Sequence, residues 1–325
     1  MRFVVVGAGG IGGWLGARLA AAGHEVALVA RGAHLAALRA DGLHLHSPAG
    51  DVVVRPVQAS DDAAALGPAD VVLLAVKTWQ LPALLPALGP LIGPGTAVLT
   101  TQNGVEAPHQ VARAYGRDAV LPGTAKIFAE IEAPGRIRHV GGPGLLTYGE
   151  WDDRRTDRVE RLREALTGAG VAALVPDDIW AELWTKFLFV VPLGGLSAAT
   201  GATTGVLRSR PGTRALLAEL MGEIQAVAAA HGVVLPADVV AATLAFLDQQ
   251  PAAGRTSLHR DIHSGRPSEL DAWTGAVVRL AAATGTPAPR HAMLYELLAA
   301  RLGQDAADRA VAGAPEDRGP AAAHN

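Results

Sequence analysis

Apolar runs and helical segments alternate along the first half of the chain. The run at 71–76 is continuous, which is typical of a strand buried on both faces. Residues 79–92 have the pattern of a helix interrupted by prolines. Because strands alternate with helices, the pattern favours βαβ units and a parallel sheet. The strands expected here are 3–6, 25–30, 71–76 and 96–100, and the first helix is 10–22.

Two further groups of short strands are expected before residue 176. Residues 43–46 and 52–57 flank Ser-Pro-Ala-Gly at 47–50, which predicts a hairpin turn. Strand-like runs separated by Pro and Gly then follow, and we expect them to complete the same sheet. These runs are 120–121, 125–131, 137–140 and 145–148, followed by a helix at 157–168 and a short strand at 171–175.

Strand signals stop beyond about residue 176, and helical patterns replace them. Asp177 and Asp178 are suited to cap a helix in which Trp180, Trp184 and Phe187 recur at helical spacing. The tail from 313 is polar and rich in Ala, Gly and Pro, which is typical of a disordered segment. The other expected helices are 213–231, 236–249, 265–284 and 290–302.

Glycines come directly after the first predicted strand and open the first helix. Gly7 permits the tight turn out of the strand, Gly9 lets a pyrophosphate approach the backbone, and Gly12 lets the helix pack closely on the sheet. The helix N-terminus adds unpaired N–H groups and the positive end of its dipole. This placement favours a dinucleotide site over a glycine-rich turn without a ligand. The residues expected to form the site are Gly7, Ala8, Gly9, Gly10, Ile11 and Gly12.

These patterns predict an α/β fold class with two domains. A Rossmann-like domain with a mostly parallel sheet is expected at 1–175, and an all-α domain at 176–312. The length of 325 residues agrees, since single cores stop growing near about 250–300 residues.

The end of the second strand bears on cofactor choice. An NAD-preferring site usually places Asp or Glu there, whereas this chain has Ala30 and Arg31. An arginine can pair with the 2′-phosphate of NADPH, so the sequence favours NADPH. A solvated arginine at the strand end is the alternative.

Composition excludes several classes of protein. The net charge of −3, with no run of Lys or Arg, gives no basic surface for nucleic acid or an anionic membrane. There are no cysteines, so disulfides and thiolate chemistry are excluded. No signal peptide is expected, and charges such as Arg18, Glu219 and Glu223 interrupt the Ala/Leu-rich segments. We therefore expect a soluble cytoplasmic protein.

Three polar residues are candidates for the chemistry. Lys77 and Asn103 follow successive strands, and the carboxyl ends of parallel strands are where such sheets bind ligands. Lys186 lies on the helix with the tryptophans. It either extends to solvent or faces an interdomain cleft, where burial would suit it to proton donation.

Together these residues resemble the ketopantoate reductase (2-dehydropantoate 2-reductase) family over about residues 1–310. The stretch from Ser257 to Glu269 is the most family-specific part. The motifs that carry the resemblance are Gly7-x-Gly9-x-x-Gly12, Arg31, Val-Lys77-Thr-Trp-Gln, Gln-Asn103-Gly, Ile179-Trp-x-x-x-Trp-x-Lys186 and Ser257-x-x-x-Asp261-Ile-x-x-Gly-Arg-x-x-Glu269.

The resemblance implies NADPH-dependent reduction of a 2-keto acid in pantothenate biosynthesis. By position, Lys186 resembles the general acid, and Lys77 and Asn103 resemble residues that contact cofactor and substrate. Ser257 resembles a substrate ligand, and Glu269 the carboxylate that supports the site and keeps Lys186 protonated. The alternative for Glu269 is an exposed carboxylate beside Arg266.

The chain departs from the family at two positions. The family usually carries asparagines four and eight residues after its lysine, where this chain has Val190 and Gly194, with Pro192 expected to kink the helix. Val190 suits an apolar contact and Gly194 adds room, which predicts a substrate less polar or bulkier than ketopantoate. The alternative is that Ser197 or Thr200 supplies the missing hydrogen bonds and pantoate synthesis is retained.

The sequence also leaves other functions open. His44 with His46, and His259 with His263, have spacings that metals can use, but no third ligand accompanies either pair, so no metal is expected. A same-fold dehydrogenase acting on another carbonyl compound and a non-catalytic NADPH sensor remain the alternative functions. The expected partner is a small 2-keto acid, and a homodimer through the helical domain stays open.

Overall fold

The computed structural model describes residues 1–312, with side chains described as far as residue 303. The tail expected to be disordered, 313–325, lies outside the described residues. The chain divides into two compact units. The first comprises Met1–Val190 and Gln225–Val239, and the second comprises Val191–Ile224 and the chain from Val240 onward. The expected boundary at residue 175 follows the last strand, whereas the compact units divide inside helix α6 (Ile179–Thr200).

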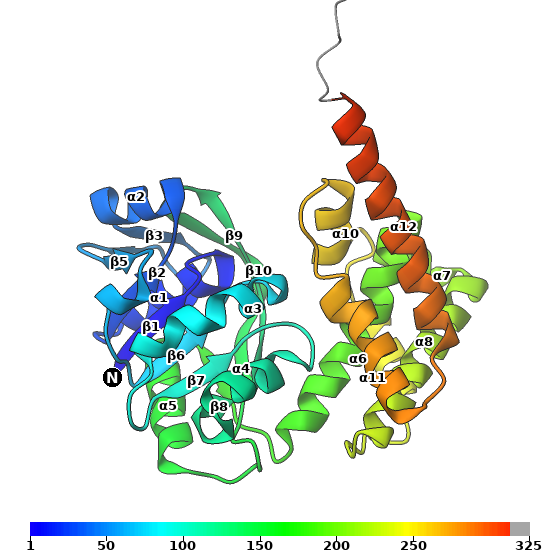
Figure 1. Ribbon diagram of the computed structural model, residues 1–325, viewed down its shortest axis with the longest axis horizontal. Helices are drawn as coiled ribbons and strands as arrows, with labels where there is room; N and C mark the ends of the chain where they lie inside the picture. The colour runs from blue at the N-terminus through cyan, green and yellow to red at the C-terminus, as the bar shows by residue number, and fades with distance from the viewer. Residues whose placement is uncertain (313–325) are drawn as a thin grey trace, which may run out of the picture. The chain divides into compact units, whose positions relative to one another are not determined.

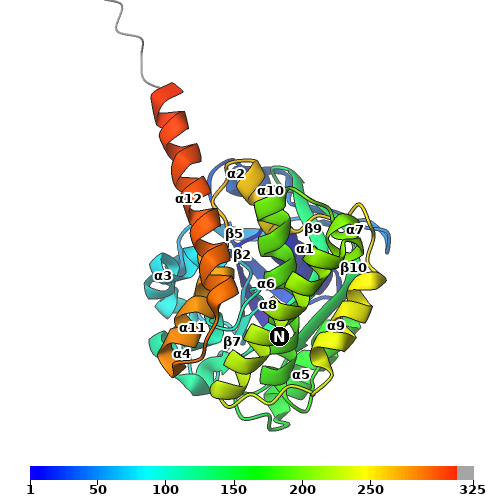
Figure 2. The ribbon, with the colours of Figure 1, turned by 90° about the vertical axis from the view of Figure 1, so that its right-hand side faces the viewer.

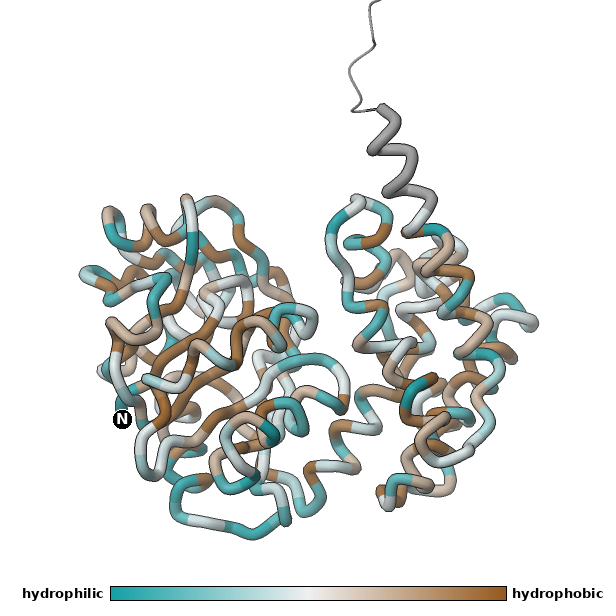
Figure 3. Tube along the Cα trace, viewed as in Figure 1, coloured by the Kyte–Doolittle hydropathy of each residue, from teal (hydrophilic) through white to brown (hydrophobic). Residues whose placement is uncertain are grey.

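A six-stranded parallel sheet forms the centre of the first unit (Figure 1). Its order is β5-β2-β1-β6-β7-β8, and every neighbouring pair is parallel, as the alternating pattern predicted. The apolar runs of the sequence lie in these strands (Figure 3). The strands are β1 (Arg2–Val6), β2 (Glu25–Val29), β5 (Gln58–Ser60), β6 (Val71–Leu74), β7 (Ala97–Thr100) and β8 (Val120–Leu121).

The strands expected to complete this sheet form a second one instead. Only β8 joins the first sheet, while β9 (Gly123–Ala133) and β10 (Arg136–Tyr148) pair antiparallel as a long ribbon. The second sheet has the order β11-β10-β3-β4, with β9 on the free side of β10. The predicted hairpin is present in it as the antiparallel pair β3 (Leu43–His46) and β4 (Val52–Val54), and β11 (Ala172–Leu174) is its edge.

Helix α1 (Gly10–Ala21) packs between the two sheets. Its residues Trp14, Leu15 and Leu19 share one buried cluster with Phe3 and Leu28 of the first sheet and with strands of the second. A separate cluster covers the other face of the first sheet, where Val4 and Val72 meet helices α3 (Leu81–Leu84) and α4 (Ala107–Tyr115). Both faces of the central strands are therefore buried, which explains their uninterrupted apolar sequence.

The sequence pattern missed several short elements of the first unit. Helix α2 (Gly32–Asp41) buries only Leu35 and Leu38, so its apolar periodicity is weak. The proline-interrupted helix at 79–92 is resolved into one α-helical turn between 3-10 segments, because Pro82, Pro86 and Pro90 cannot donate a backbone hydrogen bond. The 3-10 segments are η2 (Thr78–Gln80) and η3 (Leu85–Leu91), with η1 (Ala63–Ala65) and η4 (Arg117–Ala119) elsewhere, and α5 (Asp157–Gly168) has its predicted bounds.

The described part of the second unit is helical throughout, as predicted (Figure 2). The expected helix at 265–284 begins later, with the π-helix η5 (Asp271–Gly275), and a separate short helix carries Ser257. The helices are the end of α6, α7 (Thr204–Ser209), α8 (Pro211–Ala230), α9 (Val239–Asp248), α10 (Ser257–His263), α11 (Ala276–Thr284) and α12 (Pro289–Ala312).

A buried carboxylate of α8 caps the last helix. The backbone N–H groups of Arg290 and His291 donate to the carboxylate oxygens of Glu223 at 2.9 and 3.1 Å. Nδ1 of the fully buried His291 lies 2.8 Å from the same carboxylate. These hydrogen bonds lower the pKa of Glu223 against the opposing effect of its burial, so the helix N-terminus gains a charged cap.

Helix α6 continues through Pro192 and is long and apolar enough to cross a membrane by length and composition alone. The expectation that charges interrupt every apolar segment of such length was therefore wrong for this helix. Its most apolar window is 67% buried inside the protein, as in the core helices of proteins without a membrane span.

Candidate active site

The glycine loop has the geometry expected of a dinucleotide cradle. Gly7 has a φ of +97°, and a Cβ there would lie 2.6 Å from Val76. A Cβ on Gly12 would lie 2.0 Å from the carbonyl oxygen of Gly7, so the helix packs as closely as predicted. By contrast, nothing lies within 4 Å of the Cβ position of Gly9. Gly9 caps α1, whose first turn has no acidic residue, so the positive end of the helix is open to an anion.

His34, which the sequence analysis missed, holds this loop from outside. Its Nε2 donates to the carbonyl oxygen of Ala8 at 2.8 Å, and the backbone N–H of Gly135 donates to its Nδ1 at 3.1 Å. Burial lowers the pKa of His34, so the ring is held neutral, as one donor and one acceptor require. The only sequence signal was its place three residues after Arg31, which does not by itself indicate a contact.

Arg31 lies at the end of β2, where the prediction placed a 2′-phosphate contact. It is exposed, and its backbone is the N-cap of α2. Because β1 and β2 are parallel neighbours, Arg31 lies near the loop that follows β1. A cation in this place, beside a helix N-terminus, suits a phosphate group.

The loops that carry Lys77 and Asn103 lie side by side. Strand β6 pairs with β1 on one side and β7 on the other, so the loops after all three strands meet at one edge of the sheet. The Gln102 side chain binds the Lys77 loop, since its Nε2 donates to the carbonyl oxygens of Leu74 and Val76 at 2.8 and 3.0 Å. Lys77 and Asn103 are both half-buried. The structure thus brings the glycine loop, Lys77 and Asn103 to one edge within the first unit.

Lys186 is held against β9 rather than extended into solvent. Its Nζ donates to Oγ1 of Thr124 at 2.6 Å and to the carbonyl oxygen of Ala125 at 2.7 Å. All three residues belong to the first unit. These two hydrogen bonds fix the position of the Nζ atom beside β9. Thr124 was not predicted as a partner of Lys186, because the two residues are 62 positions apart.

The start of α6 is fixed to the first unit, which fixes the position of Lys186. Oδ1 of Asp178 accepts from the N–H of Ala181 at 2.8 Å, and Asp153 accepts from the N–H of Ile179 at the same distance. Of the two aspartates expected to cap this helix, Asp178 accepts one of these hydrogen bonds. The other is accepted by Asp153, which was not predicted as a cap. Trp180 donates from Nε1 to the carbonyl oxygen of Trp151, and their rings meet edge to face.

The second unit carries the remaining predicted residues. Ser257 opens α10 and is half-exposed, while Glu269 is only 5% exposed. The alternative of an exposed carboxylate at this position is wrong, because Glu269 is buried, and Arg266 pairs with Asp261 at 3.0 Å. His259, on the same short helix as Ser257, is buried, with its Nδ1 2.8 Å from the carbonyl oxygen of Ser197.

The room expected at Gly194 is already filled. A Cβ at that position would lie 2.8 Å from Cζ3 of Trp273, and Trp273 is only 2% exposed. The indole of η5 therefore occupies the space that the missing side chain would need, which corrects the expectation of a larger pocket there. Val190, one turn earlier, is half-buried and belongs to the first unit.

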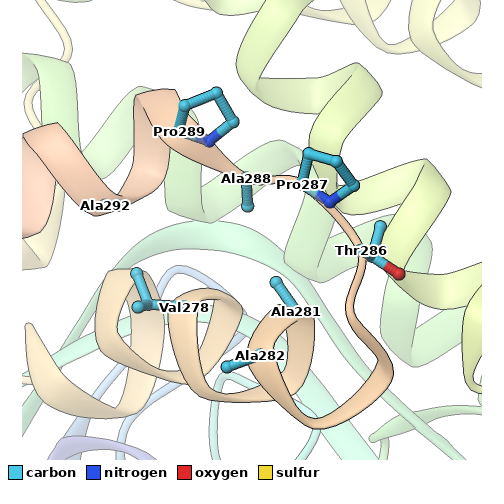
Figure 4. Close-up of a pocket in the computed structure, with 8 residues that line it drawn as sticks. All are labelled: Val278, Ala281, Ala282, Thr286, Pro287, Ala288, Pro289 and Ala292. Atoms are coloured by element: carbon cyan, nitrogen blue, oxygen red, sulfur yellow. The ribbon is translucent and has the colours of Figure 1, made fainter.

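Two other features of the structure carry no candidate chemistry. Among the side chains of residues 1–303, no group of three or more His, Asp or Glu residues could hold a metal ion. His46 lies 2.8 Å from Glu132. A hollow of about 360 Å³ lies between α11 and the start of α12 (Figure 4). It is lined by alanines, prolines, Val278 and Thr286, with none of the candidate residues, so it offers no group for catalysis.

Comparisons with known proteins agree with the fold. The family model described as "Ketopantoate reductase PanE/ApbA" matches residues 3–153, and its C-terminal counterpart matches residues 178–302. A 2-dehydropantoate 2-reductase of Mesorhizobium japonicum is 36% identical over 310 residues, covering 89% of this chain and 94% of the relative.

Solved structures share the whole architecture. The PanE/ApbA family ketopantoate reductase of Ralstonia eutropha superposes with a TM-score of 0.86 at 32% identity, covering 94% of this chain and all of that chain. D-mandelate dehydrogenase with NADH and anilino(oxo)acetate has a TM-score of 0.85 over 94% of this chain and 99% of its own. At 23% identity, the second likeness shows a shared fold alone.

Proposed function

This chain belongs to the ketopantoate reductase family, and we propose that it reduces a 2-keto acid to the 2-hydroxy acid with NADPH, using Lys186 as the general acid. The observation that carries the proposal is the position of Lys186. Its ammonium is held by Thr124 and Ala125 on β9, in the same unit as the glycine loop, Lys77 and Asn103.

The residues of the first unit fit a nicotinamide dinucleotide. The open space at Gly9 and the uncapped N-terminus of α1 suit a pyrophosphate, and Arg31 at the end of β2 suits a 2′-phosphate. When bound, NADPH supplies the hydride for the reduction. Lys77 and Asn103, at the neighbouring strand ends, are then placed to contact the cofactor and the substrate.

In this proposal, Lys186 stabilises the negative charge that reduction creates. Hydride addition to the carbonyl carbon leaves negative charge on the oxygen, and an ammonium at hydrogen-bond distance stabilises this charge. Transfer of a proton from Nζ to the oxygen completes the 2-hydroxy acid and leaves a neutral amine, which recovers a proton from solvent. One such acid typically contributes about 10²–10⁴-fold to the rate. Glu269 and Ser257 of the second unit are proposed to support the acid and to bind the substrate, respectively.

The substrate is proposed to be less polar than ketopantoate. Neither Val190 nor Gly194 has a side-chain hydrogen-bonding group, and Trp273 fills the space at Gly194. The hydroxyls of Ser197 and Thr200 donate to the backbone carbonyls of Ala202 and Leu196 at 2.8 and 2.6 Å, which speaks against their recruitment by a substrate hydroxyl. Without amides at positions 190 and 194, this part of the site has little means of selecting a hydroxylated substrate.

Ketopantoate itself is the second candidate. Relatives named 2-dehydropantoate 2-reductase reach 36% identity and cover most of this chain, which favours retention of the family's reaction.

The test is NADPH oxidation with ketopantoate beside branched and aromatic 2-keto acids, such as 3-methyl-2-oxobutanoate and phenylglyoxylate. We expect turnover that falls about 10²–10⁴-fold in Lys186→Ala while NADPH still binds. Strong preference for ketopantoate would select the second candidate. NADPH binding without turnover of any keto acid would instead indicate a sensor and refute the proposed reaction.

A further inference from the structure

One exposed lysine lies on the strand that anchors Lys186. Lys126 is two residues after Thr124 on β9, and residues two apart on a strand point to the same face. Burial along β9 follows this alternation, since Ala125 and Ile127 belong to the core with α1 whereas Lys126 and Phe128 are exposed. Thr124 lies on the same face of β9 as Lys126, but it is buried because it contacts the Lys186 side chain. Lys126 therefore comes next to the position of the Lys186 ammonium on that face.

Lysine is rare in this protein. Of 28 Lys and Arg residues only three are lysines, Lys77, Lys126 and Lys186, and all three belong to the first unit. Two of them are residues of the proposed active site. At surface positions elsewhere the chain uses arginine, so a lysine at position 126 is not explained by a general need for exposed positive charge.

The charge of Lys126 is also uncompensated within the described part of the chain. Glu130 and Glu132, further along β9, pair with Arg138 of β10 at 3.3 and 3.5 Å, and Glu132 also contacts His46. Among the described residues, no hydrogen bond or ion pair involves the side chain of Lys126. The ribbon thus satisfies its own carboxylates and leaves one ammonium available beside Lys186.

We propose that Lys126 binds the carboxylate of the 2-keto acid while Lys186 serves its carbonyl oxygen. This inference rests on the proposed function and adds a residue that determines substrate class. The carboxylate and the ketone of a 2-keto acid are on adjacent carbons, so the group that binds the carboxylate must lie a few ångströms from the group that serves the carbonyl oxygen. Alternate residues of a strand are separated by about 7 Å, a gap that two flexible lysine side chains bridge. No covalent step is added, since Lys126 acts by charge-assisted hydrogen bonding.

The experiment compares a charged substrate with its uncharged ester. Steady-state kinetics with phenylglyoxylate and with methyl phenylglyoxylate are measured for the wild type, Lys126→Met, Lys126→Arg and a control, Arg161→Met. Arg161 is an exposed cation of α5 whose side chain makes no hydrogen bond or ion pair with other described residues, so its substitution by Met matches the change in net charge.

Lys126→Met is expected to raise the KM for phenylglyoxylate roughly 10- to 100-fold, the range of a lost hydrogen bond to a charged group. The KM for the methyl ester and for NADPH should stay within about twofold, because the ester has no carboxylate charge and the cofactor is held elsewhere. Lys126→Arg should recover most of the affinity for the acid, and Arg161→Met should resemble the wild type.

Different results separate this inference from the proposed function. One outcome is that the wild type reduces phenylglyoxylate while Lys126→Met leaves unchanged the ratio of the KM for the acid to the KM for the ester. In that case the inference is overturned and the proposed function stands. A raised KM for NADPH with an unchanged KM for the acid would also overturn it, because Lys126 would then bind the cofactor. If the wild type reduces no keto acid, both fall together.

Discussion

The Nζ atom of Lys186 lies 2.6 Å from Oγ1 of Thr124, across 62 positions of sequence. This contact, with the one to the Ala125 carbonyl, holds the Nζ atom of the proposed acid in place before any substrate arrives. It also identifies Thr124 as a positioning residue for Lys186.

Thr124→Val removes the hydroxyl acceptor and nearly preserves the volume of the side chain. We expect kcat to fall roughly 10-fold or more, because a hydrogen bond to a charged group is lost. The basic limb of the kcat–pH profile should also move to lower pH, since an ammonium with fewer acceptors loses its proton more readily. Thr124→Ser should recover the wild-type profile. A pH profile of Thr124→Val that superposes on the wild type would leave Thr124 with a packing role only.

Arg31→Ala is expected to weaken the binding of NADPH but not that of NADH. Loss of a charge-assisted contact to the 2′-phosphate should raise the KM for NADPH roughly 10- to 100-fold and leave the KM for NADH nearly unchanged. Both values are measured with the same keto acid, and Arg161→Met again provides the control for net charge. An equal effect on the two cofactors would contradict a 2′-phosphate contact.

His34 should make cofactor binding depend on pH. Burial lowers its pKa below the ordinary value of about 6.5, so the folded state favours the neutral ring. Its contribution to stability is therefore complete above about pH 6.5 and is lost as the pH falls through the lowered pKa. Protonation of Nδ1 breaks the hydrogen bond from Gly135, which loosens the glycine loop.

We accordingly expect NADPH affinity, measured by fluorescence titration, to fall more steeply on acidification in the wild type than in His34→Gln. The ionisation of the 2′-phosphate is common to both proteins, so the comparison isolates the histidine. Parallel pH dependences would rule out this role for His34.

Gly194→Ala should destabilise the protein. Its Cβ would lie 2.8 Å from the buried Trp273 ring, and overpacking of this kind typically costs about 1–3 kcal/mol in the free energy of unfolding. Gly222→Ala is the matched control in helix α8, where nothing lies within 4 Å of the new Cβ. That substitution should stabilise by about 0.5–1 kcal/mol through helix propensity. Urea denaturation measures the free energy of unfolding of both variants. Equal values would show that the Trp273 ring moves aside at little cost.

The sequence predicted those parts of the fold that depend on local pattern. The parallel strands, the glycine loop and the long helices follow from apolar runs and periodicity, and the structure confirms them. The sequence did not predict that β9 and β10 belong to a second sheet, because runs such as 125–131 carry no information about which strand they pair with. Short elements such as α2 bury too few side chains to leave a periodic signal.

The candidate site shows the same division. Glycines and strand-end residues were identifiable because a turn or a strand end restricts what can stand there. Thr124, His34 and Trp273 were not, since each acts through a contact with a residue distant in sequence. Trp273 in particular reverses the interpretation of Gly194, and only packing could show it.

Strand β9 touches the cofactor loop at one end and the acid at the other. A Cβ on Gly10 would lie 2.1 Å from the carbonyl oxygen of Ala129, and Thr124, five residues earlier on the strand, receives the lysine. At about 3.4 Å per residue, a strand segment of about 17 Å separates the loop proposed to hold the pyrophosphate from the contact of the proposed acid. An insertion or deletion in this segment would change that separation even if every proposed site residue were kept. The length of the segment is thus a constraint on the proposed site that does not depend on residue identity.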